Sequence, residues 1–295
     1  MEIVVHDTAS TMAALLDLPV AKRPDALREM LAPLDRVMSA VGGGDVVAMH
    51  QQGAGFRLDR DDPRYPAALR EMREAGVWSR VRDCLAAGWD RLRSAAPGIR
   101  HADELHVLVV LGDPDDEHLT VRSRGYFGLG GFPGVVLLVM WPTATSLAKI
   151  GYAAAHELHH NVRYANVTWN PVTVTVGEQV VAEGLAEAFV RELFGEQALG
   201  HWATELRGPE LQAAYEKVVA GIDVTGMHNL TAYVHGDATA RLWGQKPVGL
   251  PDFAGYAAGL RIVDAHCAVS GLSAAQSVAL SAREILANAG VPTNA

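Results

Sequence analysis

The amino-acid sequence predicts a mainly helical α+β protein with a small sheet. Apolar residues recur at three- and four-residue spacing between Thr11 and Ala96 and again after Thr143, which is typical of amphipathic helices. Between these stretches, residues 104–142 hold short apolar runs bounded by glycine, proline and aspartate. Such runs are typical of strands.

The N-terminal part is predicted to be helical after one short strand. Residues 2–5 (EIVV) form this strand, and residues 11–96 follow with helical spacing. A glycine-rich and charged stretch over 41–66 is expected to be a loop between helices. Because the pattern changes near residue 104, we expect an N-terminal helical region over 1–103 and a catalytic domain over 104–295.

Three strands are predicted after residue 104. LHVLVVLG (105–112) is a buried strand that ends at the turn-rich GDPDDE. A second strand is expected over 118–131, where polar and apolar residues alternate. FPGVVLLVMWP (132–142) is the third and is stopped by Pro142.

The remainder of the chain returns to helical spacing. A helix is predicted from Thr143 to Arg163, with Thr145 or Ser146 as its N-cap. A second clear helix covers 178–194 and is closed by Gly195. Later helices are expected over 209–221, 254–270 and 273–289.

Composition excludes several classes of protein. The chain has 34 acidic and 25 basic residues and a formal charge of -9, whereas nucleic-acid binders usually present a basic face. Cys84 and Cys267 are too few for a disulfide framework or a thiolate zinc site. MEIVVHDTAS does not have the pattern of a signal peptide, and the longest apolar run, 135–141, is too short to span a membrane. We therefore expect a cytoplasmic location; the oligomeric state is left open.

The segment HELHH at 156–160 contains the pattern H-E-x-x-H. Residues four apart lie on one face of a helix, so the imidazoles of His156 and His160 can bind one metal ion. Glu157 lies roughly 100° further round the helix, where it can act on a water without binding the metal. The alternative is a solvated surface helix, but the preceding IGYAAA favours a packed one.

A catalytic zinc needs a third protein ligand and keeps one position for water. The helix EQVVAEGLAEAFVREL begins 18 residues after His160, and it carries Glu183 and Glu187 on one face with apolar neighbours. We predict that Glu183 is the third ligand. Glu187 would accept the free N–H of a ligating histidine, or, in the alternative interpretation, is merely solvated. On an ideal helix Glu178 points roughly 140° away from Glu183, so Glu178 is a poorer candidate for the third ligand.

The chain resembles the bacterial group DUF2268, described as predicted zinc-dependent proteases. The resemblance rests on AAAHELHHNVRY, VVAEGLAEAFV and FAGYAAGLRIVDAHC and covers about residues 104–290. The HExxH-then-Glu order is also similar to gluzincins, whose thermolysin-like members have E-x-x-x-D on the second helix; Glu187 stands where that aspartate would fall. The resemblance implies a zincin-like fold with the small sheet beside the HExxH helix, Zn²⁺ as cofactor and protease activity.

The expected chemistry is hydrolysis by a metal-activated water, with Glu157 as general base. The tetrahedral oxyanion needs a further hydrogen-bond donor. Tyr256 is the first candidate, because it stands among small residues at a predicted helix start, and His235 in a turn is the second. Tyr233 and His228 are weaker candidates. The strand over 132–142 is expected to pair with an extended peptide.

Three classes of function are compatible with these residues. Hydrolysis of a peptide or protein substrate is favoured. Chemistry on a small non-peptide substrate is the first alternative, and a metal-binding protein without catalysis is the second. Glu157 disfavours the last class, because a structural zinc site has no use for a base and usually closes with four protein ligands.

Overall fold

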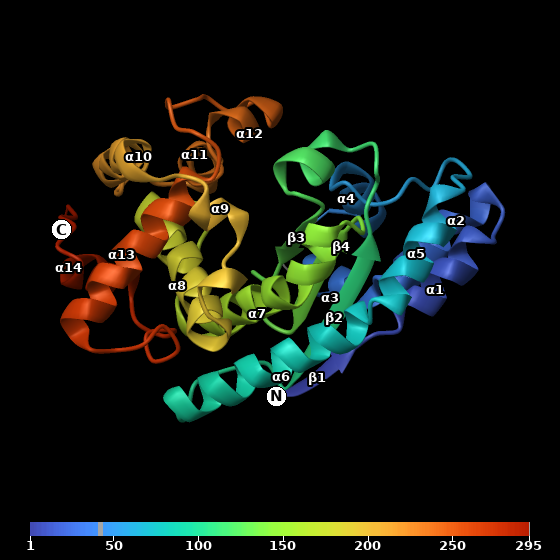
Figure 1. The fold of residues 1–295 in the computed structure, drawn as a ribbon, viewed down its shortest axis with the longest axis horizontal. Helices are drawn as coiled ribbons and strands as arrows, with labels where there is room; N and C mark the ends of the chain where they lie inside the picture. The colour runs from blue at the N-terminus through green and yellow to red at the C-terminus, as the bar shows by residue number, and fades with distance from the viewer. Residues whose placement is uncertain (41–43, 295) are drawn as a thin grey trace. The chain divides into compact units, whose positions relative to one another are not determined.

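The computed structural model describes residues 1–40 and 44–294 of the 295-residue chain. Within these residues it confirms a mainly helical α+β fold with one small mixed sheet (Figure 1). The chain divides into two compact units: Met1–Trp89 with His101–Asn161, and Asp90–Arg100 with Val162–Ala295. The expected division at residue 103 concerns the extent of the catalytic domain and stays a prediction.

The sheet of the first unit has the strand order β1-β2-β4-β3. β1 (Glu2–Val5), β2 (Glu104–Leu111) and β4 (Val135–Met140) are parallel, and β3 (Tyr126–Leu129) runs antiparallel to β4 at one edge. The inner strands have the sequences ELHVLVVL and VVLLVM, and nearly all of their side chains are buried. Such continuous apolar runs are expected where helices cover both faces of a sheet.

Two expectations about this sheet were wrong. Only the end of the stretch 118–131 is a strand, because His118–Arg122 form a single π-helical turn, η2. The Asp116 carboxylate accepts a hydrogen bond from the Leu119 N–H at 2.8 Å, which favours a helical turn there. In addition, β4 is paired on both sides, so it has no free edge for a peptide; the free edges of the sheet belong to β1 and β3.

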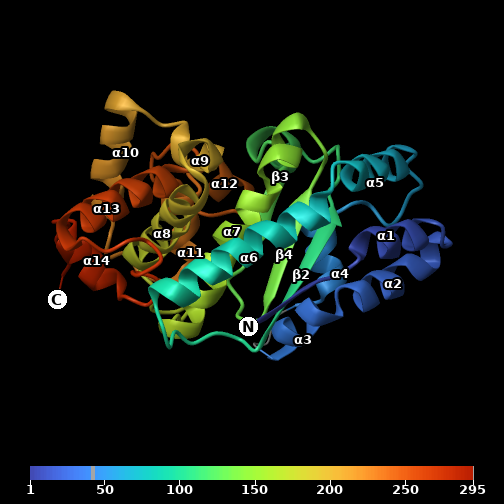
Figure 2. The ribbon, with the colours of Figure 1, turned by 60° about the horizontal axis from the view of Figure 1, so that its bottom comes forward.

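Helices of the first unit cover both faces of the sheet. In Figure 1, α6 and the first part of α7 run across one face, and α3 and α4 lie behind the strands; Figure 2 shows α6 again crossing in front of β2 and β4. Of the expected loop over 41–66, residues 41–43 lie outside the described residues, and Val46–Gln52 form a helix capped by the Asp45 carboxylate. The elements between β1 and β2 are α1 (Thr8–Leu16), η1 (Val20–Lys22), α2 (Arg23–Met30), α3 (Ala32–Ala40), α4 (Val46–Gln52), α5 (Arg64–Glu74) and α6 (Val77–Ala95).

The long helix α7 (Ala144–Asn166) carries the HELHH segment, as predicted. Its cap is Thr143 and not Thr145 or Ser146, because the helix already begins at Ala144. The Thr143 hydroxyl accepts the Ser146 N–H at 3.1 Å, and the Ser146 hydroxyl accepts the Thr143 N–H at 2.8 Å. α7 packs closely on α6, since a Cβ added at Gly151 would lie 2.8 Å from the Cys84 sulfur.

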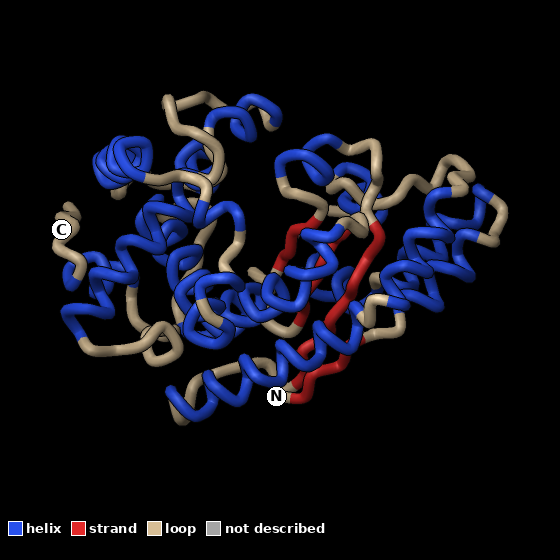
Figure 3. Tube along the Cα trace, viewed as in Figure 1, coloured by secondary structure: helices blue, strands red, loops and turns tan. Residues whose placement is uncertain are grey.

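The second unit is built round α8 (Val176–Phe194) and α13 (Ala254–Ser270). The two helices cross at Gly184 and Gly259, where a Cβ added to either glycine would lie 2.2 Å from the backbone of the other helix. Figure 3 shows the described part of this unit as helices and loops. The other elements are η3 (Glu196–Ala198), α9 (His201–Thr204), α10 (Gly208–Ala220), α11 (Met227–Val234), α12 (Asp237–Leu242) and α14 (Ala282–Asn288).

The last helix is shorter than the predicted range of 273–289. Only Ala282–Asn288 are helical, because the carbonyls of Val278 and Leu280 each accept a hydrogen bond of 3.0 Å from the Arg163 guanidinium. Arg163 is buried, and this burial lowers its pKa to about 10, so it remains a cation at neutral pH. None of the helices in the described residues combines the length and the apolar character needed to cross a bilayer.

Candidate metal centre

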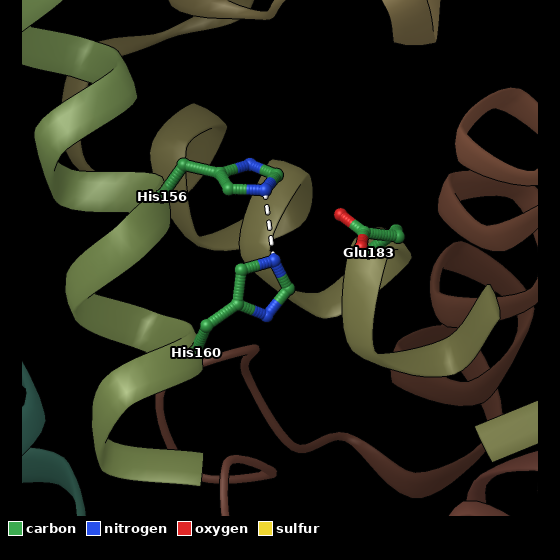
Figure 4. A group of neighbouring side chains, drawn as sticks. All are labelled: His156, His160 and Glu183. Carbon is green, nitrogen blue, oxygen red and sulfur yellow. Dashed lines mark hydrogen bonds between the residues drawn. The ribbon is translucent and has the colours of Figure 1, made fainter. Parts of the chain in front are cut away.

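The rings of His156 and His160 converge from successive turns of α7 (Figure 4). Their Nε2 atoms lie 2.9 Å apart, and both side chains are buried. Two nitrogens bound to one tetrahedral zinc at about 2.0–2.1 Å would be separated by about 3.3 Å. The pair therefore needs to open by only a few tenths of an ångström to hold one ion.

Glu183 of α8 completes a group of three possible ligands. One nitrogen of each histidine and one carboxylate oxygen all lie within 4.8 Å of one another, and the carboxylate turns toward the rings in Figure 4. In residues 1–40 and 44–294, no other group of three or more histidine, cysteine and acidic side chains meets so closely. Two imidazoles and one carboxylate are a donor set that suits zinc. The residues that are present fit the metal that the sequence predicts.

Glu157 is buried against the edge strand β3. A Cβ added at Gly128 would lie 2.4 Å from the Glu157 Cγ and Oε1 atoms, and one at Gly130 would lie 2.3 Å from the Glu157 carbonyl oxygen. Only glycine at these two positions lets the strand and the loop after it approach α7 so closely. The Glu157 carboxylate is thereby placed beside the strand that ends the sheet.

Asn161 holds the connection between β3 and β4 against α7. Its amide nitrogen donates to the carbonyls of Phe132 and Val135 at 2.7 and 2.9 Å, and its amide oxygen accepts the Gly134 N–H at 2.9 Å. A fully satisfied buried amide of this kind fixes a loop firmly. Asn161 therefore has a structural role. Its position directly after HELHH, on a helix already expected to be buried, is a signal that could have indicated this role.

The other acidic residues of α8 have distinct contacts. Glu178 forms a capping box with Thr175, in which the carboxylate accepts the Thr175 N–H at 2.7 Å, so it belongs to the helix start. The Glu187 carboxylate accepts the Gly200 N–H at 2.9 Å and the Trp202 indole N–H at 2.6 Å. Glu187 is thus buried and holds the segment before α9; its role toward a ligating histidine stays a prediction.

Tyr256 and His235, the two candidates for the oxyanion donor, lie side by side. Their ring centroids are 5.7 Å apart, and both side chains are half-buried. Tyr256 is in the first turn of α13, as predicted, and His235 follows the last residue of α11. The Tyr256 ring also lies 6.0 Å from that of Trp202, which Glu187 holds.

The close approach of α13 to α11 fixes this pair. A Cβ added at Gly255 would lie 2.5 Å from the Val234 Cα atom. The weaker candidates lie differently: the Tyr233 ring is packed against Gly221, at the end of α10, and His228 is exposed. Of the four candidates for the oxyanion donor, Tyr256 and His235 therefore lie in contact with each other.

Comparison with known proteins agrees with this centre. Residues 92–287 match the family described as "Predicted Zn-dependent protease (DUF2268)". The chain belongs to this family. The matched DUF2268 region contains His156, Glu157, His160 and Glu183.

Relatives of this DUF2268 chain occur in Bacillus subtilis. The protein YjfC is 31% identical, with 99% of each chain covered. YjaZ is 32% identical over 136 residues, which are 44% of this chain and 47% of YjaZ. Both relatives are described as uncharacterized proteins. No solved structure matches the chain.

Proposed function

We propose that the chain is a zinc-dependent peptidase of the zincin type, in which His156, His160 and Glu183 bind the metal. The observation that carries this proposal is the meeting of two buried imidazoles with one buried carboxylate, with Glu157 buried next to His156 on α7. Three protein ligands leave one coordination position open, as catalytic zinc sites do, whereas structural sites usually close with four. The family description supports the same activity. A cytoplasmic location stays a prediction.

The protein groups have distinct tasks in this reaction. Bound zinc would supply a lower pKa for the attacking water and polarisation of the scissile carbonyl. Glu157 accepts a proton from that water and delivers it to the nitrogen of the leaving amine. Tyr256, or His235 in its place, donates a hydrogen bond to the oxyanion that forms on the carbonyl.

The free edge of β3 suits an extended peptide. A peptide that adds a strand to a sheet uses unpaired backbone groups at the edge, and β3 has β4 on one side only. Gly128 lies in β3 directly against the Glu157 carboxylate. A peptide paired to β3 would pass the general base, which supports a peptide over a small non-peptide substrate.

Digestion of a mixed peptide library tests this function. The purified protein should cleave peptides, a chelator should stop cleavage, and added zinc should restore it. Cleavage that persists after the metal has been removed would contradict a zinc peptidase. If zinc binds but no peptide is cut, the alternatives remain: hydrolysis of a small non-peptide substrate, or metal binding without catalysis.

Gly128→Ala should lower peptide turnover by about a hundredfold, because an added methyl group displaces the Glu157 carboxylate and misplaced catalytic groups cost rates of this order. The backbone at Gly128 is not in the left-handed region, so alanine adds no backbone strain there. The methyl group overpacks the buried Glu157 side chain, which should lower the free energy of unfolding by about 1–3 kcal/mol, while the zinc content stays close to that of the native chain. Gly44→Ala, where an added Cβ meets nothing within 4 Å, is the control. Normal turnover of Gly128→Ala would show that the carboxylate position is not critical.

Tyr256→Phe should reduce turnover by roughly one to three orders of magnitude, the range for the loss of one oxyanion donor, without loss of zinc. Tyr233→Phe removes a hydroxyl from a ring packed elsewhere in the same unit and should leave turnover unchanged. Steady-state kinetics on one cleaved peptide measure both. If His235→Ala abolishes turnover and Tyr256→Phe does not, His235 is the donor. Normal turnover in both variants would exclude this pair.

A further inference from the structure

Gln179 joins the candidate ligand Glu183 to α7 through two hydrogen bonds. Its amide nitrogen donates to the Glu183 Oε1 atom at 2.8 Å, and its amide oxygen accepts the Tyr164 hydroxyl at 3.3 Å. Both ends of the amide are engaged, and only this orientation gives the carboxylate a donor and the hydroxyl an acceptor. The position of the amide is therefore determined by its two neighbours.

The spacing of these residues repeats that of the metal ligands. Tyr164 stands four residues after His160 on α7, and Gln179 stands four residues before Glu183 on α8. Residues four apart lie on the same helix face, one turn from each other. Tyr164 therefore lies one helical turn from His160, and Gln179 lies one helical turn from Glu183, each on the same helix face as that ligand.

We infer that Gln179 is a positioning residue for the metal centre, and that Tyr164 holds Gln179 in place. The inference rests on the metal centre proposed above. A hydrogen bond to Oε1 restricts the rotation of the Glu183 carboxylate beside the two histidines. Partners of this kind reduce the freedom that a ligand loses on binding, and their removal commonly costs 10–100-fold in metal affinity. A neutral amide does this without adding a charge beside the carboxylate.

The chain contains a matched pair outside the metal centre. On α10, the Gln212 amide nitrogen donates to the Glu216 carboxylate at 2.6 Å, again four residues apart, and its oxygen accepts a hydrogen bond from Arg261. Both residues of this pair lie at the surface in the second unit. The same substitution at Gln212 therefore removes an equivalent hydrogen bond on a helix without a metal ligand.

Zinc affinity measured by competition with a chromophoric chelator tests the inference. Gln179→Leu keeps the volume of the side chain but removes both hydrogen bonds, and the zinc dissociation constant should rise about 10–100-fold. Gln212→Leu should leave the zinc dissociation constant unchanged. Tyr164→Phe should raise this constant by less than Gln179→Leu does. Adding Tyr164→Phe to Gln179→Leu should have no further effect, because Tyr164 acts through Gln179.

Cobalt substitution gives a second measurement that does not depend on activity. The visible absorption of the cobalt-loaded protein reports the geometry of the ligands, and Gln179→Leu should shift it while Gln212→Leu does not. Unchanged affinity and an unchanged spectrum in a folded Gln179→Leu variant would overturn the inference. Glu183→Ala separates the two proposals: if it also keeps its zinc, the metal centre itself is wrong, whereas if it loses zinc and Gln179→Leu does not, only the role of Gln179 is wrong.

Discussion

Glu157→Gln is expected to lower peptide turnover by at least about a hundredfold while the protein keeps its zinc. Glutamine has nearly the shape of glutamate, so it can occupy the same buried position against Gly128. It cannot accept the proton of the attacking water at neutral pH, and the step that needs a base becomes slow. Initial rates on a cleaved peptide, with the zinc content of the same sample, measure the effect.

Glu71→Gln is the matched control for this substitution. Glu71 is exposed on α5, so the loss of its charge should change neither turnover nor zinc content. Near-normal turnover of Glu157→Gln would exclude the mechanism proposed here. Loss of zinc from Glu157→Gln would instead show that Glu157 is a ligand and that the base must be sought elsewhere.

The native chain should contain about one zinc per molecule, and His156→Ala and His160→Ala should each lose it almost completely. Removing one imidazole leaves two protein ligands, fewer than the three that catalytic zinc sites use. Glu183→Ala should weaken zinc binding strongly, and Glu187→Ala should cost only about 10–100-fold, because its carboxylate is expected to act on a ligand and not on the metal. Elemental analysis of the purified proteins measures these contents.

His101→Ala, at an exposed histidine, should keep the full zinc content. Because His156 and His160 are buried, circular dichroism must show that the alanine variants are folded, and His156→Gln provides a polar replacement of similar size. Full occupancy in folded variants of both histidines would refute the assignment of the ligands. A larger loss of zinc from Glu187→Ala than from Glu183→Ala would show that the roles of the two glutamates are exchanged.

Local patterns in the sequence were sufficient to predict much of the fold. Strands β2 and β4 follow from continuous apolar runs, and α8 follows from helical spacing that ends at Gly195, whose φ is 84°. Tertiary contacts caused the errors. Nothing in the spacing of 273–289 indicates that Arg163, more than a hundred residues earlier, binds the carbonyls that a longer helix would need. Similarly, the order of the strands decides which edge of the sheet is free, and the pattern of apolar residues does not indicate this order.

The candidate site shows the same division between local and distant information. His156, Glu157 and His160 are fixed by spacing within one helix, and the same four-residue spacing could have indicated Tyr164 and Gln179. The proximity of Tyr256 to His235 depends on how α13 packs against α11. This packing is a tertiary contact, and no local pattern in the sequence indicates it. The close contact of Gly128 with Glu157 also joins separate elements, and a glycine in a strand indicated only that some backbone approaches there.

The crossing of α8 and α13 at Gly184 and Gly259 links the candidate centre to the timing of protein synthesis. Ribosomes extend a chain from its N-terminus at about 5–20 residues per second, so α8 is made several seconds before α13. During that interval the helix that carries Glu183 has no α13 to pack against. We expect an unfinished chain to present both histidines without a fixed Glu183, and so to be unable to cut other nascent chains beside it. Proteolytic competence would then begin only after α13 has been made and has packed against α8.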